Sequence, residues 1–178
     1  MSQLKVDSIV PRGGLPSGAQ GGIIQMKYTQ LTTQQSVSTS EAGTNLSSLD
    51  TTITPSSSSN RIIIQCFLNI SSNSGNTVGI QIRRGSSFAD LVASANGNRR
   101  RYTARGATTW NADGNHMHNY MINVMDAPAT TSSTTYKAFF AVEGGNTVYL
   151  NRNRHDSNSS SAIYGATMST MLLMEVSG

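Results

Sequence analysis

The sequence predicts an all-β protein, namely an antiparallel β-sandwich of jelly-roll-like form that has an extended N-terminal arm. Composition is the first reason, because Ser, Thr and Asn supply 60 of the 178 residues whereas Asp, Glu, Lys and Arg together reach only 12%. Ser, Thr and Asn favour turns over helix interiors, and β-branched residues suit pleated strands. Periodicity is the second reason, since apolar and polar residues alternate with a period of two from Gly22 onward, as in half-buried strands.

The first 22 residues form the arm in this prediction. They hold two short apolar pairs, Leu4/Val6 and Ile9/Val10, among prolines and glycines. Such a segment cannot build a core of its own, and its backbone N–H and C=O groups need outside partners. We therefore expect residues 1–22 to anchor the chain on another protein, with these four side chains as apolar plugs and the backbone adding to a partner's sheet.

Residues 23–178 form the β-sandwich domain in this prediction. Turn-forming runs rich in Ser, Asn, Gly and Pro separate the alternating segments. The stretch 95–114 has no clear strand pattern, and a further strand around Tyr102 stays open as an alternative. Strands are expected near 22–31, 48–54, 61–72, 76–84, 88–94, 115–126, 134–143, 146–151 and 162–176. The run GGN between the two strands 134–143 and 146–151 predicts a β-hairpin.

Strand parity predicts which side chains form the core. In strand 61–72 one face is apolar throughout, with Ile62, Ile64, Cys66, Leu68 and Ile70. The single cysteine is therefore expected to be a buried core thiol rather than a reactive group.

Two further strands have one mixed face each. In strand 115–126, His116, His118, Tyr120, Ile122 and Val124 share one face, while Met117, Asn119, Met121, Asn123 and Met125 share the other. In strand 134–143, Tyr136, Ala138, Phe140 and Val142 lie opposite Lys137, Phe139 and Ala141. A methionine-rich and aromatic face with few charges is typical of a subunit interface, so we expect these faces to contact other subunits.

The chain offers little for catalysis or for cofactors. It has nine carboxylates and three histidines, and it lacks nucleophile-elbow, zinc-protease, phosphate-loop and CxxC motifs. We expect no enzyme activity, no cofactor and no bound metal. One alternative stays open for the metal, because three copies of the pair His116/His118 around a threefold axis would present six imidazoles. The sequence also lacks an apolar secretory or membrane-spanning stretch, so we expect assembly in a cytoplasm without membrane insertion.

Arginine dominates the basic residues, with ten of the thirteen cations. Guanidinium groups beside aromatic rings bind phosphate, carboxylate or sugar surfaces, whereas a net charge of +4 is too small for a nucleic-acid-binding domain. A solvated loop, or contact with an acidic neighbouring subunit, is the alternative. The candidate surface-binding residues are Arg99, Arg100, Arg101, Arg105, Trp110, Arg152 and Arg154, and a host-surface glycan is the expected ligand.

Both ends of the chain resemble virion structural and fibre proteins of marine tailed bacteriophages, notably those that infect cyanobacteria. At the N-terminus the resemblance lies in MSQLKVDSIVPRGGLPSGAQGGIIQ. Towards the C-terminus it lies in NYMINVMDAPATTSSTTYKAFFAVEGGNTVYLNR and in ATMSTMLLMEV. The likeness covers about 1–30 and 116–176, and the middle of the chain, which includes the arginine run, does not share it.

The resemblance implies a non-enzymatic virion protein, commonly trimeric, with an N-terminal anchor and a distal knob. The chain lacks the shaft repeats of long fibres, so we expect a short head or tail fibre whose sandwich attaches to the host surface. Its partner through residues 1–22 would be a capsid or tail protein of the phage. Two alternatives remain, a capsid decoration protein that stabilises the particle and a free carbohydrate-binding, lectin-like module. A polysaccharide-degrading enzyme is a more distant one.

Overall fold

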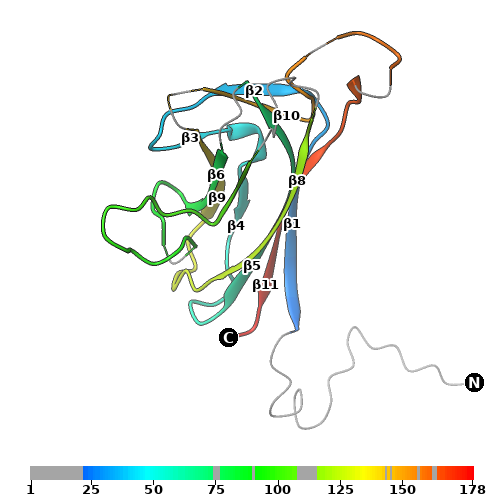
Figure 1. Cartoon of the computed structure of the whole chain (residues 1–178). Coiled ribbons are helices and arrows are strands. Elements are labelled where there is room, and N and C mark those ends of the chain that lie inside the picture. Colours follow the sequence, from blue (N-terminus) through cyan, green and yellow to red (C-terminus); the bar gives the residue numbers. More distant parts are fainter. Residues whose placement is uncertain are drawn as a thin grey trace, which may run out of the picture.

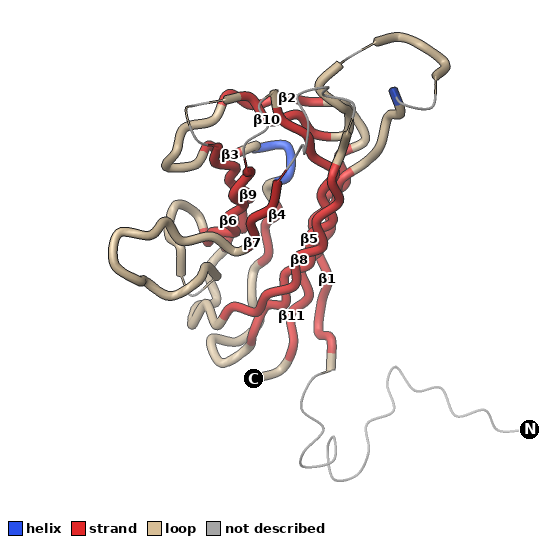
Figure 2. The backbone as a smooth tube through the Cα atoms, viewed as in Figure 1, coloured by secondary structure: helices blue, strands red, loops and turns tan. Residues whose placement is uncertain are grey.

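The computed structural model describes residues 22–73, 77–89, 91–107, 116–142, 144, 146–155, 157–161 and 164–178. The predicted anchoring residues Leu4, Val6, Ile9 and Val10 lie outside these ranges. In the described part the chain forms strands and one short 3-10 helix (Figures 1 and 2). These elements are β1 (Ile23–Leu31), β2 (Gln35–Ser38), β3 (Thr44–Asn45), η1 (Ser47–Leu49), β4 (Thr51–Ile53), β5 (Arg61–Ser72), β6 (Thr77–Arg84), β7 (Ala104–Ala107), β8 (His118–Asp126), β9 (Thr134–Val142), β10 (Thr147–Leu150) and β11 (Ser169–Val176).

The strands make two antiparallel sheets that pack face to face, which confirms the predicted fold class. The larger sheet has the order β1-β11-β5-β10-β2, with β8 on the other edge of β5. The smaller sheet has the order β3-β9-β6-β7, with β4 also paired to β9. The strands can be renumbered 1 to 8 along the chain if β3 and β4 count as one interrupted strand and the short β2 and β10 are left out. The larger sheet then has the order 1-8-3-6 and the smaller sheet the order 2-7-4-5, which is the strand order of a jelly roll.

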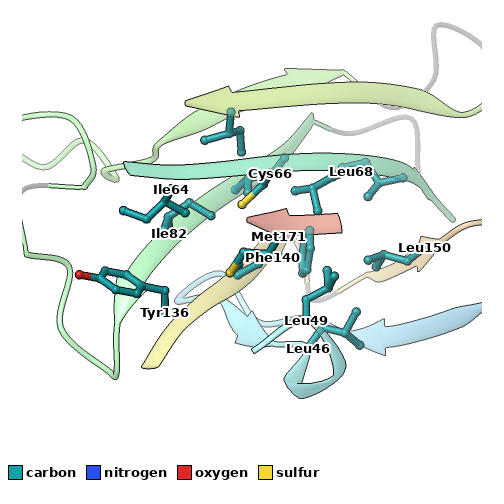
Figure 3. Packing of buried hydrophobic residues seen from close by; sticks show 14 of the residues in the cluster. Leu46, Leu49, Ile64, Cys66, Leu68, Ile82, Tyr136, Phe140, Leu150 and Met171 are labelled. Atoms are coloured by element: carbon teal, nitrogen blue, oxygen red, sulfur yellow. The ribbon is translucent and has the colours of Figure 1, made fainter. Parts of the chain in front are cut away.

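The core lies between the sheets and follows the predicted parity. Ile62, Ile64, Cys66, Leu68 and Ile70 of β5 are all buried and face the apolar side of β9. Figure 3 shows several of them against Ile82, Phe140 and Met171, which come from three other strands. Burial raises the pKa of the Cys66 thiol to about 12, so the cysteine stays protonated and inert, as expected for a core residue.

A polar contact ties the two sheets together at one end of the core. Asp126 at the end of β8 accepts a hydrogen bond from the Tyr136 hydroxyl of β9 at 2.7 Å. Arg84 of β6 donates to the same carboxylate oxygen at 3.1 Å. Because β8 belongs to the larger sheet and the other two strands to the smaller one, this carboxylate fixes how the sheets are placed.

The predicted hairpin at 134–151 is wrong. After β9 the chain leaves the smaller sheet, and β10 pairs with β5 and β2 in the larger one. Gly144 lies in this connection with φ of +73°, a conformation that favours glycine. The same glycine-rich turn therefore serves as a corner between sheets.

Other strand predictions need smaller corrections. Residues 88–94 form no strand in their described part, where Leu91 and Val92 are buried within turns. The predicted strand 162–176 begins only at Ser169, and 48–54 is divided between η1 and β4. The short strands β2 and β3 were not predicted, whereas β7 starts two residues after Tyr102. None of the helices in the described ranges is long and apolar enough to cross a membrane.

Candidate functional site

The segment 91–103 folds over the outer face of the smaller sheet and carries the arginine run with it. Three hydrogen bonds attach it to β6: the Thr103 amide donates to the Ile80 carbonyl at 2.8 Å, the Ile82 amide donates to the Thr103 hydroxyl at 2.8 Å, and the Gln81 side-chain amide donates to the Arg101 carbonyl at 2.8 Å. Within the segment the Ala93 amide donates to the Tyr102 carbonyl at 3.0 Å. These contacts hold the arginines beside β6 although the segment has no regular secondary structure.

Aromatic rings support the guanidinium groups at one end of this surface. The Arg83 guanidinium lies between two rings, 4.4 Å from the centre of Phe88 and 3.9 Å from that of Phe139. The Arg101 guanidinium lies 5.7 Å from the centre of the Phe88 ring. Arg83 also donates to the Ala42 carbonyl at 2.7 Å, and Arg101 donates through Nε to the Ala93 carbonyl at 2.6 Å, so stacking and hydrogen bonds together orient these two guanidinium groups.

Gly79 of β6 makes room for an aromatic floor at the other end. A Cβ atom added at Gly79 would lie 2.1 Å from Cε1 of Tyr102, so the ring rests directly on the strand backbone. The Arg105 guanidinium lies 5.9 Å from the centre of that ring. Any larger residue at position 79 would displace the tyrosine.

Beside this ring the surface is hollowed. A cavity of about 300 Å³ adjoins one of about 400 Å³, and the two share Arg100, Tyr102 and Arg105. We call them together the arginine hollow. The first cavity is also lined by the small residues Thr77 and Ala141. The hollow is lined by Glu41, Thr77, Arg99, Arg100, Tyr102, Arg105, Ala141 and Val142.

The charge of the hollow is positive. Glu41 pairs with Arg100, which also donates to the Glu41 carbonyl at 2.8 Å. Arg99 and Arg105 are exposed, and neither meets a carboxylate among the residues that the structure describes. The described part of the chain has four carboxylates, and Glu41 is the only one of these four that lines the hollow. The arrangement suits an anion, because free guanidinium groups offer paired N–H donors to carboxylate, sulfate or phosphate oxygens.

The structure separates the predicted binding residues into two groups. Arg99, Arg100 and Arg105 line the hollow, and Arg101 lies next to it. Arg152 and Arg154 follow β10 of the larger sheet, where Arg152 stacks 4.3 Å from the centre of the Tyr149 ring. In Figure 1 the green segment before β7 and the orange segment after β10 lie far apart. Trp110 falls outside the described residues.

Sequence reasoning missed the part of the hollow that comes from the sheet. Gly79, Thr77 and Ala141 are small residues on β6 and β9, and Glu41 lies before β3. Nothing in the local pattern marks Gly79 as the support for a ring 23 positions later, because that contact depends on how segment 91–103 folds back.

A second notable surface is the outer face of the larger sheet. Cross-strand register places side chains of β1, β11, β5 and β8 in three rows across this face. None of them is charged, and Met121 is 82% exposed and Met26 60% exposed. We call this the uncharged face; its rows are Met26, Met174, Ile63 and Met125, then Tyr28, Leu172, Gln65 and Asn123, then Gln30, Thr170, Phe67 and Met121.

The uncharged face is not flat. A cavity of about 220 Å³ lies beside the exposed Met121 and is bordered by Tyr28, Phe67 and Leu172. A protruding apolar side chain thus stands next to an apolar depression on the same face. Sequence parity found the β8 side of this face, including Met121 and Met125, but not its continuation over β11 and β1.

His118 lies on the opposite side of β8 from the uncharged face. His118 shares the inward parity of Ile122, and its Nε2 atom is buried. It therefore cannot meet partner histidines across a symmetry axis at the uncharged face. Within the described ranges no group of three or more His, Cys, Asp or Glu side chains is placed to hold a metal ion.

Comparison with known proteins gives only a distant likeness. No family model and no curated protein sequence matches the chain. Among solved structures, a mutant VP2 protein of infectious bursal disease virus in derived T=1 particles matches 93% of this chain at 13% identity and a TM-score of 0.39. The structure of the Gt strain of infectious bursal disease virus matches 88% of this chain, also at 13% identity and with a TM-score of 0.39. The chain spans about 40% of the length of these proteins, and a likeness of this degree concerns the fold alone.

Proposed function

We propose that this chain is a non-enzymatic structural subunit of a bacteriophage virion. In this proposal residues 1–22 anchor it to a capsid or tail protein, and the sandwich 23–178 forms a homotrimer that attaches to the host surface. The resemblance of both chain ends to phage virion proteins supports the assignment to a bacteriophage virion. The uncharged face is the observation that carries the assembly, because the exposed apolar side chains of Met26, Met121 and Met125 gather on it, and a contiguous exposed apolar patch often serves a functional contact.

The size of the face fits the core of a subunit interface. Strands lie about 4.8 Å apart and successive rows about 6.8 Å apart, so four strands and three rows cover on the order of 400 Å². A standard interface buries roughly 800 Å² on each partner. The face would therefore supply the dry centre, while neighbouring polar residues form the rim, as in known interfaces.

Two other functions compete with a host-attachment fibre. A capsid decoration protein would use the same assembly face, and its removal would lower the resistance of the particle to heat while adsorption continued. A free lectin-like module would bind its glycan without any virion and would tolerate loss of residues 1–22. The uncharged face favours a protein that works as an assembly, which fits the fibre and the decoration protein better than a free monomeric module.

The test is the native mass of the full-length chain, measured by light scattering. We expect a mass near three times 19.0 kDa for the natural protein. Met121→Lys should shift it towards the monomer, because the variant buries an unpaired ammonium group within the interface. The matched control is Ser160→Lys, which adds the same charge in the exposed segment 157–161 and should leave the mass unchanged. A monomeric natural protein, or a Met121→Lys variant that keeps the assembled mass, would contradict the proposal.

A further inference from the structure

We propose that the arginine hollow binds an acidic polysaccharide, with a carboxylate or sulfate group held by Arg99 and Arg105 and a sugar ring placed against Tyr102. This inference rests on the proposed function, since it names the host-surface ligand of the attached sandwich. It also assigns the site to the outer face of the smaller sheet rather than to the segment after β10.

The first argument is the chemistry of the hollow. Two exposed guanidinium groups, those of Arg99 and Arg105, border the same space and meet no carboxylate in the described part of the chain. The neighbouring Arg100 is held in place by Glu41, so it helps to define the wall. Guanidinium groups bind carboxylate and sulfate oxygens through charge-assisted and often paired hydrogen bonds.

The second argument is that the hollow offers more than charge. The Tyr102 ring is fixed on the β6 backbone by the absence of a side chain at Gly79, and Thr77 and Ala141 leave open space beside it. A preformed aromatic surface next to a hydroxyl group suits a sugar ring, which has both apolar and hydroxyl-bearing sides. A simple inorganic anion would use the arginines and leave the ring without a role.

The third argument is shape. The cavity of about 300 Å³ continues into the one of about 400 Å³ along shared walls, which gives a ligand longer than one sugar a path to follow. Volumes of this size lie at the lower end of the range of about 300–1,000 Å³ for small-molecule sites. A polymer that occupies the hollow with two or three residues and continues into solvent fits this geometry.

The arginine hollow and the uncharged face lie on the outer sides of two different sheets. An assembly through the uncharged face therefore leaves every hollow free to bind. Several equivalent hollows on one particle would raise the effective affinity for a repeating polymer.

The experiment measures binding to the full-length protein by calorimetry. The probes are a heparin octasaccharide, a polygalacturonate octasaccharide, the uncharged maltooctaose and sodium sulfate. We expect at least one acidic octasaccharide to bind, the uncharged one not to bind, and sulfate alone to bind much more weakly. The double variant Arg99→Gln/Arg105→Gln should lose about tenfold or more in affinity, because each charged hydrogen bond contributes that order of magnitude.

The matched control is Arg152→Gln/Arg154→Gln, which removes the same charge from the other arginine group and should change the affinity less than about twofold. Equal losses in the two double variants would overturn the proposal, since net charge alone would then explain the binding. So would absence of binding to both acidic octasaccharides, or tighter binding of a single-stranded DNA octamer.

Light scattering on the same samples separates this inference from the assembly. A monomer that binds the acidic octasaccharide contradicts only the homotrimer, and a trimer that does not bind contradicts only the ligand. If Arg99→Gln/Arg105→Gln changes the mass, the hollow is a subunit contact and the inference is wrong.

Discussion

Glu175 on β11 is a carboxylate without exposed surface that accepts hydrogen bonds from three residues. Asn60 and Gln25 each donate to it at 2.6 Å, while Ser56 donates through its amide at 2.7 Å and through its hydroxyl at 2.8 Å. Burial alone would raise the pKa of Glu175, but these donors outweigh it and lower the pKa to about 2. The contacts join β1, the segment 54–60 and β11 at one end of the larger sheet.

This carboxylate makes the stability of the protein sensitive to acid. The folded pKa lies below the unfolded value, so the ionised form stabilises the fold above about pH 4.5, and that stability is lost as the pH falls towards about 2. Glu175→Gln should lower the free energy of unfolding at pH 7 by about 1–3 kcal/mol, because the negative charge is lost and one of the two accepting oxygens becomes an NH2 group that faces other donors. Urea unfolding at pH 7 and at pH 3 measures both effects, and the variant should lose less stability between the two pH values than the natural protein.

The control for that prediction is Glu41→Gln. Glu41 is an exposed carboxylate whose pair with Arg100 is open to solvent, so its neutralisation should change the stability at pH 7 by less than about 1 kcal/mol. Equal effects of the two substitutions would show that the donors around Glu175 do not stabilise the ionised form.

At the scale of elements, prediction from sequence succeeded where one strand carries its own signal. In β5 the core-facing residues are Ile62, Ile64, Cys66, Leu68 and Ile70, and the opposite side holds polar residues such as Gln65. Such alternation predicts both the strand and its buried side without information about the neighbouring strands. The structure confirms the bounds of β5 and the inward face of β9 for this reason.

Prediction failed where the partner of a segment decides its structure. The GGN turn after β9 is compatible with a hairpin and with a corner, and only the pairing of β10 with the end of β5 selects the corner. Phe88, Leu91 and Val92 have the composition of a strand, yet the described part of that segment packs as turns. The arginine hollow was found only in part, since its floor at Gly79 depends on a contact distant in the sequence.

The corner between β9 and β10 should be sensitive to substitution at Gly144. Its φ of +73° costs an L-residue about 1 kcal/mol or more, while the nearest atom to an added Cβ is 3.6 Å away, so the cost is conformational rather than steric. Gly144→Ala should therefore lower the free energy of unfolding by about 1 kcal/mol and the melting temperature by about 2–4 °C. Differential scanning calorimetry measures the change.

The matched substitution is Gly22→Ala, at a glycine where an added Cβ would meet no described atom within 4 Å and which is not among the glycines with positive φ. It should leave the melting temperature unchanged. If Gly144→Ala also leaves the melting temperature unchanged, the left-handed conformation at Gly144 is not required for the chain to pass from one sheet to the other.

At the scale of the whole molecule, the jelly-roll order explains why the two candidate surfaces are independent. Residues that face the core come from alternate positions of both sheets, so each sheet has one outer side that the core does not use. The larger sheet has the uncharged face there, and the smaller sheet has the arginine hollow. Assembly and ligand binding can therefore change separately under mutation.

The same organisation predicts that the sandwich folds without the arm. Among the residues that the structure describes, the main core cluster runs from Leu31 to Leu173, and the contact between the sheets at Asp126 involves Arg84 and Tyr136. A chain that starts at residue 23 should therefore keep its melting temperature within about 2 °C, which corresponds to a loss of less than about 1 kcal/mol. It should also keep the mass of the full-length protein in light scattering, since the uncharged face begins at Met26.

The two measurements on this truncated chain have distinct meanings. A lower mass with an unchanged melting temperature would place the assembly contacts in residues 1–22 and remove the uncharged face from the interface. A melting temperature lower by more than about 4 °C would correspond to a loss above about 1 kcal/mol and would make these residues part of the fold. The expected result, with both values retained, leaves residues 1–22 free to anchor the assembly on a larger particle, because neither the core nor the interface would depend on them.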